Sequence, residues 1–276
     1  MILLDFSQIL ISSYFVNKQV LRQDIDEGMF RHITLNSILY YKKKFGKKYG
    51  DLIICNDSRH TWRKDVFPHY KANRKKTRED DKETWVNLFE MINTVRDEVR
   101  TVFPYKNMEV YGCEADDIIG VLATGFCQVE PIMIVSSDKD FMQLQKYPNI
   151  KQYSPLKKKE LKADDPVGFL REHIIRGDSS DGVPNIKSDD DVFVTEGKRQ
   201  ARITQKFVDG YTIGSNDYLD NAQRNTTLID LIFTPKELKD NILEAFHGQE
   251  VNTRKNLFNY FVKNKLKNLM SNIQDF

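Results

Sequence analysis

Residues 131–140 read PIMIVSSDKD, and this stretch decides the fold of the chain. The apolar, partly β-branched residues 132–135 predict a short strand that is buried on both faces. Pro131 stands directly before this run, where a strand tolerates proline. Asp138 and Asp140 follow it, and in an open parallel sheet ligands bind outside the carboxyl ends of the strands. We therefore predict an α/β fold with a functional site at the end of this strand.

Asp138 and Asp140 place two carboxylates one residue apart. Like charges this close repel each other and are costly to remove from water. A divalent cation between them offsets that cost, which makes a metal site the first hypothesis. The alternative is structural, because either aspartate could cap the N-terminus of the next helix.

Two more strand-like runs end in aspartate. Residues 2–7 read LLDFS after Ile2, and residues 51–57 read DLIICND, so Asp5 and Asp57 stand at or just past the end of an apolar run. Aspartate is depleted in strands but common in turns, and a turn explains each of these residues taken alone. Its recurrence at three strand ends favours a shared acidic site.

Helical patterns at residues 30–45 and 83–103 separate these strands. A short strand is expected at residues 108–111. A further helix follows in the stretch YGCEADDIIGVLA at residues 111–123, whose first turn carries Glu114, Asp116 and Asp117. The helix dipole favours acids at an N-terminus and explains one or two of them. It does not explain three acids beside strands that also end in aspartate.

A domain boundary is expected near residue 160, after Pro155 and the lysines at 157–159. We expect an α/β catalytic domain at residues 1–160 and a mostly helical domain at residues 161–276. The expected helices of the second domain lie at residues 166–176, 199–208, 218–233, 235–246 and 253–269. Between the first two lies a polar turn, GDSSDGVP at residues 177–184, with Asp178 and Asp181. It is no EF-hand loop, because Val183 stands where that loop needs glycine.

A basic segment occupies residues 59–78, where eight positive charges stand against one negative charge. Trp62, Phe67 and Tyr70 are interleaved with them. Basic groups neutralise phosphates, and aromatic rings stack on unpaired bases. The alternative is a solvated, lysine-rich helix face, but the aromatic residues and Pro68 argue against a plain surface helix. The residues expected to contact nucleic acid here are Arg59, Arg63, Lys64, Tyr70, Lys71, Arg74, Lys75 and Lys76.

Composition is that of an ordinary globular protein of 276 residues, 40% hydrophobic and 30% charged. A net charge of +2 predicts no partner by itself. The three cysteines lack CxxC spacing and indicate reduced residues of a cytosolic protein. Asp5 interrupts the apolar N-terminus and no basic residues precede it, which argues against a signal peptide. No run approaches the roughly 18 apolar residues of a membrane span, so no membrane association is expected.

The acidic residues noted above all offer the same kind of ligand atom, a carboxylate oxygen. No histidine or cysteine joins them at ligand spacing, and an all-oxygen set favours Mg²⁺ or Mn²⁺ over zinc. Carboxylates around hard ions beside a basic aromatic segment indicate two-metal phosphodiester hydrolysis. The candidate ligands are Asp5, Asp57, Glu114, Asp116, Asp117, Asp138, Asp140, Asp178 and Asp181.

The chain also resembles the flap-endonuclease type of 5′ nucleases, most closely its T-even bacteriophage members. The motifs that carry the resemblance are, in order, LLDFS, CND, HYKANR, YGCEADDIIG, VSSDKDFMQL and IIRGDSSDGVPNI. The resemblance implies a PIN-like, mostly parallel sheet wrapped by helices, with a helical arch at about residues 59–82. It implies a helical C-terminal part with a helix-hairpin-helix-like element that grips duplex DNA.

Function and site roles follow from the same resemblance. It implies a Mg²⁺-dependent 5′-3′ exonuclease and flap endonuclease of DNA replication and repair that removes RNA primers from RNA–DNA hybrids and adjacent DNA, with Mn²⁺ able to replace Mg²⁺. Asp140, Asp178 and Asp181 are assigned to the second metal site and Asp117 to the outer shell. Lys71 and Arg74 are assigned to the scissile phosphate, with Tyr70 stacking on the terminal base. The first site and its surroundings are assigned Asp5, Asp57, Glu114, Asp116, Asp138 and Asp140.

Partners are also implied by the resemblance. They are DNA and RNA–DNA duplexes with 5′ ends or flaps, together with a single-stranded-DNA-binding protein or a sliding clamp. A monomer in the cytoplasm, that of the host cell if the protein is viral, is expected. Family members usually follow the acidic turn with a glycine-rich hairpin that binds a phosphate, often with a monovalent cation. Residues 186–191, IKSDDD, lack those glycines, and Lys187 could replace part of that contact.

Two rival functions remain open. A haloacid-dehalogenase-type phosphatase also uses Asp-x-Asp after a strand, but it needs that pair early in the chain. The first strand here offers only Asp5, with Ser7 two residues later. A non-catalytic DNA-structure-binding protein of the same fold is the second rival, and a degenerate member would be expected to lose acids.

Overall fold

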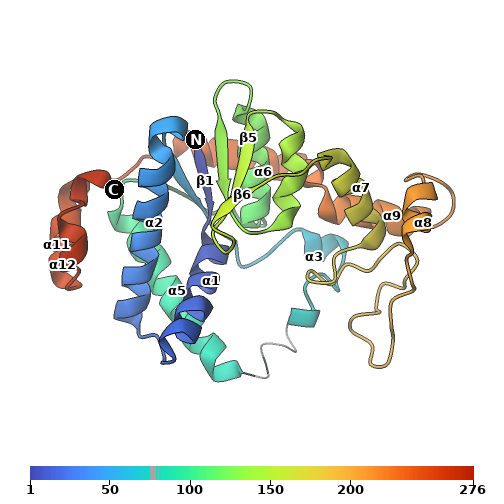
Figure 1. Cartoon of the computed structure of the whole chain (residues 1–276), viewed down its shortest axis with the longest axis horizontal. Helices are drawn as coiled ribbons and strands as arrows, with labels where there is room; N and C mark the ends of the chain where they lie inside the picture. The colour runs from blue at the N-terminus through green and yellow to red at the C-terminus, as the bar shows by residue number, and fades with distance from the viewer. Residues whose placement is uncertain (75–78, 80) are drawn as a thin grey trace.

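The computed structural model describes residues 1–74, 79 and 81–276. At its centre lies a six-stranded sheet in the order β3-β2-β1-β4-β5-β6 (Figure 1). The first five strands are parallel, and β6 pairs antiparallel with β5. The predicted mostly parallel α/β fold is thus confirmed. The strands are β1 (Ile2–Asp5), β2 (Leu52–Cys55), β3 (Lys106–Met108), β4 (Ile132–Val135), β5 (Ile150–Ser154) and β6 (Lys159–Leu161).

Helices cover both faces of the sheet because successive residues of each buried strand point to opposite faces. Leu4 and its neighbours Ile54 and Val135 pack in a cluster with α1 (Phe6–Leu21), α2 (Glu27–Tyr49) and α5 (Lys82–Val102). Leu3 points the other way, into a second cluster with α6 (Ala115–Phe126) and α10 (Lys236–Gly248). Other helices with described bounds are α3 (Arg63–Val66), η1 (Lys139–Lys146), α7 (Pro166–Arg176), α8 (Gln205–Gly210), α9 (Leu219–Ile229), η2 (Leu231–Phe233), η3 (Arg254–Asn256), α11 (Leu257–Lys263), α12 (Lys267–Met270) and η4 (Ile273–Asp275).

Strand register brings the carboxyl ends of the central strands together. Asp5, the last residue of β1, pairs with Cys55 at the end of β2, and Leu4 pairs with Val135 at the end of β4. The residues that follow these ends therefore share one edge of the sheet. The expected strand at residues 108–111 is wrong in position, because β3 ends at Met108 and the chain then turns through Gly112 at φ +83°.

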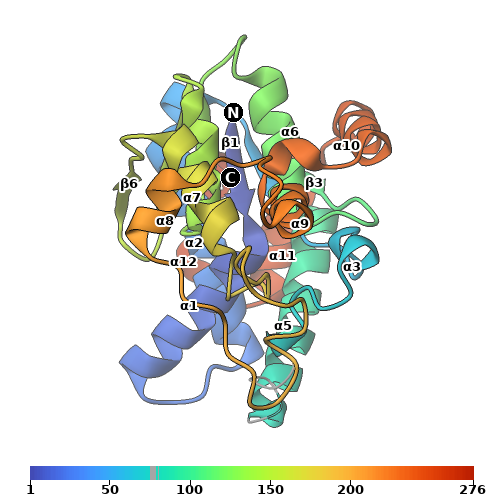
Figure 2. The ribbon, with the colours of Figure 1, turned by 90° about the vertical axis from the view of Figure 1, so that its right-hand side faces the viewer.

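The C-terminal half divides around the sheet. Figure 1 shows α7, α8 and α9 on one side and α11 and α12 on the opposite side. Turned by 90°, Figure 2 shows α10 beside α6, and the two helices are in contact. Leu257, Phe261 and Phe276 belong to the same apolar cluster as Leu4, so residues 161–276 share their core with residues 1–160.

Three helical expectations differ from the structure. The helix α1 was not expected, and most of residues 199–208 lie outside α8. The helix expected at residues 253–269 is broken into η3, α11 and α12, because Lys265 takes a left-handed conformation (φ 56°) and Leu266 N donates to Phe261 O. Among the described residues, none of the helices is both long and apolar enough to cross a membrane.

Candidate metal centre and nucleic-acid groove

Asp5 lies at the junction of β1 and α1 and faces the sheet edge. Its Oδ1 accepts from Gln8 N (3.1 Å), which caps α1, and its Oδ2 accepts from Ser136 Oγ (2.7 Å). Burial and the nearby charge of Asp57 raise the pKa of Asp5 to about 7. Burial and a like charge both destabilise the ionised form of this carboxyl group, and a bound cation would stabilise that form.

The N-terminus of α6 carries the next acids. Asp57 Oδ1 accepts from Ala115 N (2.8 Å), which fixes the loop after β2 to the first turn of α6. Glu114 is the N-cap of α6 and forms a capping box with Asp117. Burial and the charge of Asp138 raise the pKa of Asp116 well above its ordinary value. The acid cluster therefore lies at the N-terminus of α6, where the helix dipole also favours negative charge.

Asp138 and Asp140 combine the two explanations that the sequence left open. Asp138 Oδ1 accepts from Asp140 N (2.9 Å) and caps η1, so the capping reading is correct. The same carboxylates stand among other acids: burial raises the pKa of Asp138, and burial with the charge of Asp138 raises the pKa of Asp140 to about 7. The cap would by itself lower the pKa of Asp138, so burial, with the neighbouring acids, outweighs it.

The turn after α7 brings Asp178 and Asp181 to the same edge. A bridge between Asp178 and Val183 closes the turn. Gly182 has φ +70°, and a Cβ there would lie 3.1 Å from the carbonyl oxygen of His69, so glycine lets the turn pack on the basic segment. Lys71 N donates to Asp181 O (2.7 Å) across this contact.

Both carboxylate oxygens of Asp178 have hydrogen-bond partners. Its Oδ1 accepts from Ser180 N (2.7 Å) and Ser180 Oγ (2.6 Å), and its Oδ2 lies 3.1 Å from Nε2 of His173. Burial alone would raise the pKa of Asp178, but the hydrogen bonds from His173 and Ser180 outweigh it and hold that pKa below its ordinary value. Asp178 is therefore an ionised acid whose oxygens already have partners.

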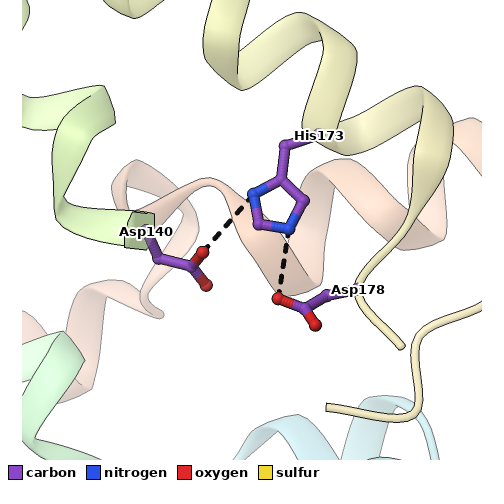
Figure 3. A group of neighbouring side chains, drawn as sticks. All are labelled: Asp140, His173 and Asp178. Carbon is purple, nitrogen blue, oxygen red and sulfur yellow. Dashed lines mark hydrogen bonds and ion pairs between the residues drawn. The ribbon is translucent and has the colours of Figure 1, made fainter. Parts of the chain in front are cut away.

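His173 corrects the expectation that no histidine joins the acids. Figure 3 shows its imidazole on α7 between Asp140 and Asp178. Nδ1 lies 3.4 Å from Asp140 Oδ1, and His173 is 6% exposed. Asp140, His173 and Asp178 form a group with metal-ligand spacing. Sequence reasoning missed it because His173 is five residues before Asp178 on a helix and far from Asp140 in the chain.

Asp117 and Arg63 lie behind the acids. Asp117 is fully buried, and its carboxylate accepts from Trp62 Nε1 (3.2 Å), Arg63 NH1 (2.9 Å), Thr234 Oγ1 (2.9 Å) and Glu114 N (2.9 Å). Arg63 is 2% exposed and also pairs with Glu114 (3.2 Å). The nucleic-acid contact expected of Arg63 does not fit this arrangement, because its buried guanidinium pairs with Asp117 and Glu114.

Tyr70 also faces inward. It is 3% exposed, its ring packs among Phe67, Val183 and Leu228, and its hydroxyl lies 2.9 Å from Glu114 Oε2 and 2.7 Å from Asp181 Oδ2. The ring has no open face for a base, so the stacking role expected for Tyr70 does not fit this structure.

Lys71 and Arg74 bind the acids directly. Lys71 Nζ lies 2.6 Å from Glu114 Oε1 and 3.4 Å from Asp181 Oδ2, and Arg74 pairs with Asp181. Burial would lower the pKa of Lys71, but the charges of Asp181 and Glu114 outweigh it and raise that pKa. Both cations stand where the acid cluster meets the surface.

A groove of about 980 Å³ opens beside them. Four of the residues expected to contact nucleic acid, Arg59, Lys64, Lys71 and Arg74, line it together with Asp57 and Glu114. The rings of Trp85 and Phe89 line it as well. Lys187 lies elsewhere, with its Nζ 3.7 Å from the centre of the Phe207 ring. Lys75 and Lys76 lie outside the described residues.

The described acids fit divalent cations. Asp116, Asp140, Asp178 and Asp181 line a cavity of about 10 Å³, which is room for about one water-sized sphere. Buried Asp140 Oδ1 and His173 Nδ1 form an ion-pair contact of 3.4 Å that lacks hydrogen-bond geometry, and a cation bound at this place would satisfy the carboxylate oxygen better. The raised pKa values of Asp116 and Asp140 mark the same place, which is expected where a cation is needed.

Family models and known proteins with similar sequences match this chain. A family model described as the 5′-3′ exonuclease, N-terminal resolvase-like domain matches residues 1–174, and one described as T4 RNase H, C terminal, matches residues 169–276. The ribonuclease H of Enterobacteria phage T4 is 34% identical over 99% of this chain and 95% of its own. The 5′-3′ exonuclease of Bacillus subtilis is 31% identical, over 46% of this chain and 44% of its own.

Solved structures agree in fold. A flap endonuclease of bacteriophage T5 in complex with DNA and metal ions has a TM-score of 0.66 at 16% identity, covering 89% of this chain and 98% of its own. The T5 5′-exonuclease with bound zinc has a TM-score of 0.64 at 15% identity, covering 90% and 98%. The family resemblance seen in the sequence is confirmed: this chain belongs to the 5′-3′ exonuclease family of nucleases.

Proposed function

We propose that the chain is a divalent-metal-dependent 5′ nuclease that hydrolyses phosphodiester bonds near the 5′ ends of DNA and RNA strands. The observation that carries this proposal is the position of the acid cluster at the end of a basic groove. Glu114 and Asp57 belong to both, so a strand lying in the groove would bring its phosphates to the acids. Family membership and the DNA-bound T5 flap endonuclease of the same fold support it.

The acids fall into two groups by their pKa values and their positions at the cavity. Asp116 and Asp140 line the cavity and, like Asp138, have raised pKa values, which makes these three the best candidates to hold ions. Asp5, Asp57, Glu114 and Asp181 surround them, while Asp117 keeps the outer position proposed for it. Two Mg²⁺ ions, with Mn²⁺ as a substitute, would supply Lewis acidity and offset negative charge on the phosphate oxygens.

Lys71 and Arg74 are proposed to receive the scissile phosphate. In this structure they neutralise Glu114 and Asp181. With cations held by the acids, the ammonium group of Lys71 and the guanidinium group of Arg74 would be available to pair with a phosphate in the adjoining groove. Preorganised positive charge of this kind stabilises the charge that develops in phosphoryl transfer.

Substrates and partners follow from the family. We propose nicked, flapped and RNA-primed duplexes as substrates and a role in replication and repair, with removal of RNA primers and adjacent DNA. Recruitment by a single-stranded-DNA-binding protein or a sliding clamp, a monomeric state and a location in the cytoplasm of a host cell belong to the same proposal. The T4 relative named ribonuclease H supports the RNA-directed part.

A 5′-labelled flapped duplex tests the proposal. With Mg²⁺ we expect short labelled products, and with EDTA we expect none. Binding without cleavage in Mg²⁺ would favour a DNA-structure-binding protein instead, and release of phosphate from a small phosphate ester without strand cleavage would favour the phosphatase. A matched RNA-primed and DNA-primed duplex then ranks RNA against DNA removal by product length.

A further inference from the structure

We propose that three lysines at the β5 end of the sheet bind the phosphate backbone of the double-stranded part of the substrate, on the side of the metal centre opposite the groove. They are Lys44 on α2 and Lys157 and Lys158 in the turn between β5 and β6, and all three are exposed. We call them the lysine cluster. The inference rests on the proposed nuclease function and names the part of the substrate that this surface binds.

The turn between β5 and β6 is fixed to the loop that carries Asp138. Leu156 N donates to Ser137 Oγ (3.1 Å), and Gln152 Nε2 donates to the carbonyl oxygen of Asp138. Because β5 runs parallel to β4, the turn follows the carboxyl end of its strand, as the acids do. The two lysines of the turn therefore lie at the same edge of the sheet as the acid cluster.

Lys44 and Lys158 act on the same hydroxyl group, although they come from different elements. Lys44 Nζ donates to Tyr40 Oη (3.1 Å) and lies 3.9 Å from the centre of the Tyr153 ring. Hydrogen bonds with Lys44 and Tyr153 lower the pKa of Tyr40, and the positive charge of Lys158 lowers it further. The helix α2 and the turn thus bring their lysines to one place on the surface.

No carboxylate forms an ion pair with the lysine cluster within residues 1–74, 79 and 81–276. By contrast, Lys43 on the same helix lies 2.6 Å from Asp275. Lys159 and Glu160, which follow the turn, add one charge of each sign. Uncompensated positive charge gathered on one surface attracts polyanions, and lysines that neutralise the phosphates of a nucleic acid gain affinity by releasing its counterions.

The order of the strands places the metal centre between the groove and the lysine cluster. Asp57 after β2 lines the groove, Asp5 and Asp138 stand at the ends of β1 and β4, and the turn follows β5. Neighbouring strands are about 4.8 Å apart, so β5 lies about 10 Å from β1. Phosphates of one DNA strand repeat about every 3.4 Å along the duplex axis, so the cluster would contact the backbone about three nucleotides from the scissile phosphate.

The surroundings of the cluster favour a duplex over an unpaired strand. Proteins hold unpaired strands with aromatic rings that stack on the bases, and the rings of Trp85 and Phe89 line the groove. In the cluster, the Tyr40 ring is in contact with Tyr41, edge-on at 5.1 Å between ring centres, and with Lys44 Nζ at 5.3 Å. Ammonium groups without such a stacking surface contact phosphates, which positions a duplex without reading its sequence.

Fluorescence anisotropy of the full-length protein in Ca²⁺ tests the inference, with a labelled flapped duplex and a labelled single strand of the flap sequence as the two probes. In the triple variant Lys44→Gln, Lys157→Gln, Lys158→Gln, we expect the flapped duplex to bind about tenfold more weakly or worse at near-physiological salt. The slope of log affinity against log salt should become less steep by about 2 to 3, because each lost phosphate contact accounts for about 0.9. Affinity for the single strand should change by less than about twofold, which also shows that the variant is folded.

The charge-matched control is Lys255→Gln, Lys263→Gln, Lys267→Gln. It removes three exposed lysines of η3, α11 and α12, and Figure 1 shows α11 and α12 at the end of the molecule away from α7, α8 and α9. This control should bind the flapped duplex within about twofold of the wild type, which separates local contacts from the loss of net charge.

Unchanged duplex affinity and salt slope in the triple variant would overturn the inference. An equal loss in the control, or an equal loss for the single strand, would also overturn it. The outcome is separate from that of the proposed function: duplex binding that depends on these lysines without cleavage in Mg²⁺ supports the inference and refutes the nuclease. Cleavage in Mg²⁺ together with normal duplex binding by the triple variant refutes the inference alone.

Discussion

The ammonium group of Lys71 lies 2.6 Å from Oε1 of Glu114, so a cation of the basic segment is already paired with an acid of the metal centre. Lys71 adopts a left-handed backbone conformation (φ 57°) to reach it, and its amide donates to Asp181 O. Non-glycine residues in this region are uncommon and occur often at functional sites. The contact therefore joins the groove and the acids at one residue.

Replacing Lys71 with Met should lower the single-turnover cleavage rate by about 100-fold or more, because a positive charge preorganised for the phosphate is lost. Substrate affinity, measured by fluorescence anisotropy in Ca²⁺, should change much less. Lys64→Met is the matched control, since Lys64 lines the same groove but pairs with none of the acids in the described contacts. Equal loss of rate in both variants would contradict the specific role of Lys71.

Replacing Arg63 with Met should destabilise the fold by about 3–5 kcal/mol, because the buried carboxylate of Asp117 would lose its cationic partner and Glu114 would keep only Lys71. Chemical denaturation measures the change. Arg59→Met, at an exposed position of the same segment, should leave the free energy of unfolding nearly unchanged and weaken DNA binding instead. A stable Arg63→Met with weakened DNA binding would restore the original expectation that Arg63 contacts nucleic acid.

Two variants of Tyr70 distinguish a hydrogen-bonding role of its hydroxyl from stacking of its ring on a base. Tyr70→Phe keeps the buried ring but removes the hydroxyl that bonds Glu114 and Asp181, so we expect about a tenfold slower cleavage with unchanged DNA affinity. Tyr70→Ala should also destabilise the fold, by about 3–5 kcal/mol, through the cavity it leaves. If the ring stacks on a base, Tyr70→Phe will instead cleave at the wild-type rate.

Stability of the metal-free protein should fall as the pH rises. The pKa values of Asp5 and Asp140 are about 7 in the folded chain against 3.8 for the free group, so the folded state binds more protons between these limits. The raised pKa of His173 acts in the same direction. The lowered pKa of Asp178 acts only below pH 3.8.

In EDTA, Tm should therefore drop by about 5 °C or more between pH 5 and pH 7.5. Mn²⁺ at pH 7.5 should restore it, because a ligand of the folded state alone adds stability. Asp140→Asn should flatten the slope. A Tm that stays constant or rises over this range in EDTA would contradict the folded-state pKa values on which the acid cluster rests.

Much of the fold could be predicted because the buried strands carry continuous apolar runs that end in aspartate. The register of β1, β2 and β4 then brings Asp5, Asp57 and Asp138 to one edge, as parallel pairing requires. The helix α1 was not predicted because Val16, Val20 and Leu21 lie on its exposed face, so its apolar residues do not form a single stripe. The sequence of residues 253–269 has a helical period throughout, but the left-handed conformation of Lys265 interrupts the helix in the structure.

The site was harder to predict where direction rather than position matters. Charge alone placed Arg63 and Tyr70 in the basic segment, but it could not tell that these two turn inward while Arg59 and Lys64 line the groove. His173 carries no motif spacing, since its partners come from η1 and from the turn after α7. Only the packing of α7 against η1 brings them together.

The most direct test of the account compares wild type and Asp138→Asn on a 5′-labelled flapped duplex in Mg²⁺ under single-turnover conditions. The variant keeps the shape of the side chain and the cap of η1 but removes a charge from the acid cluster. We predict a cleavage rate about 1000-fold lower with DNA affinity unchanged, because several kcal/mol of ion-dependent charge stabilisation are lost. Cleavage by Asp138→Asn at the wild-type rate in Mg²⁺ would contradict the metal centre proposed for this chain.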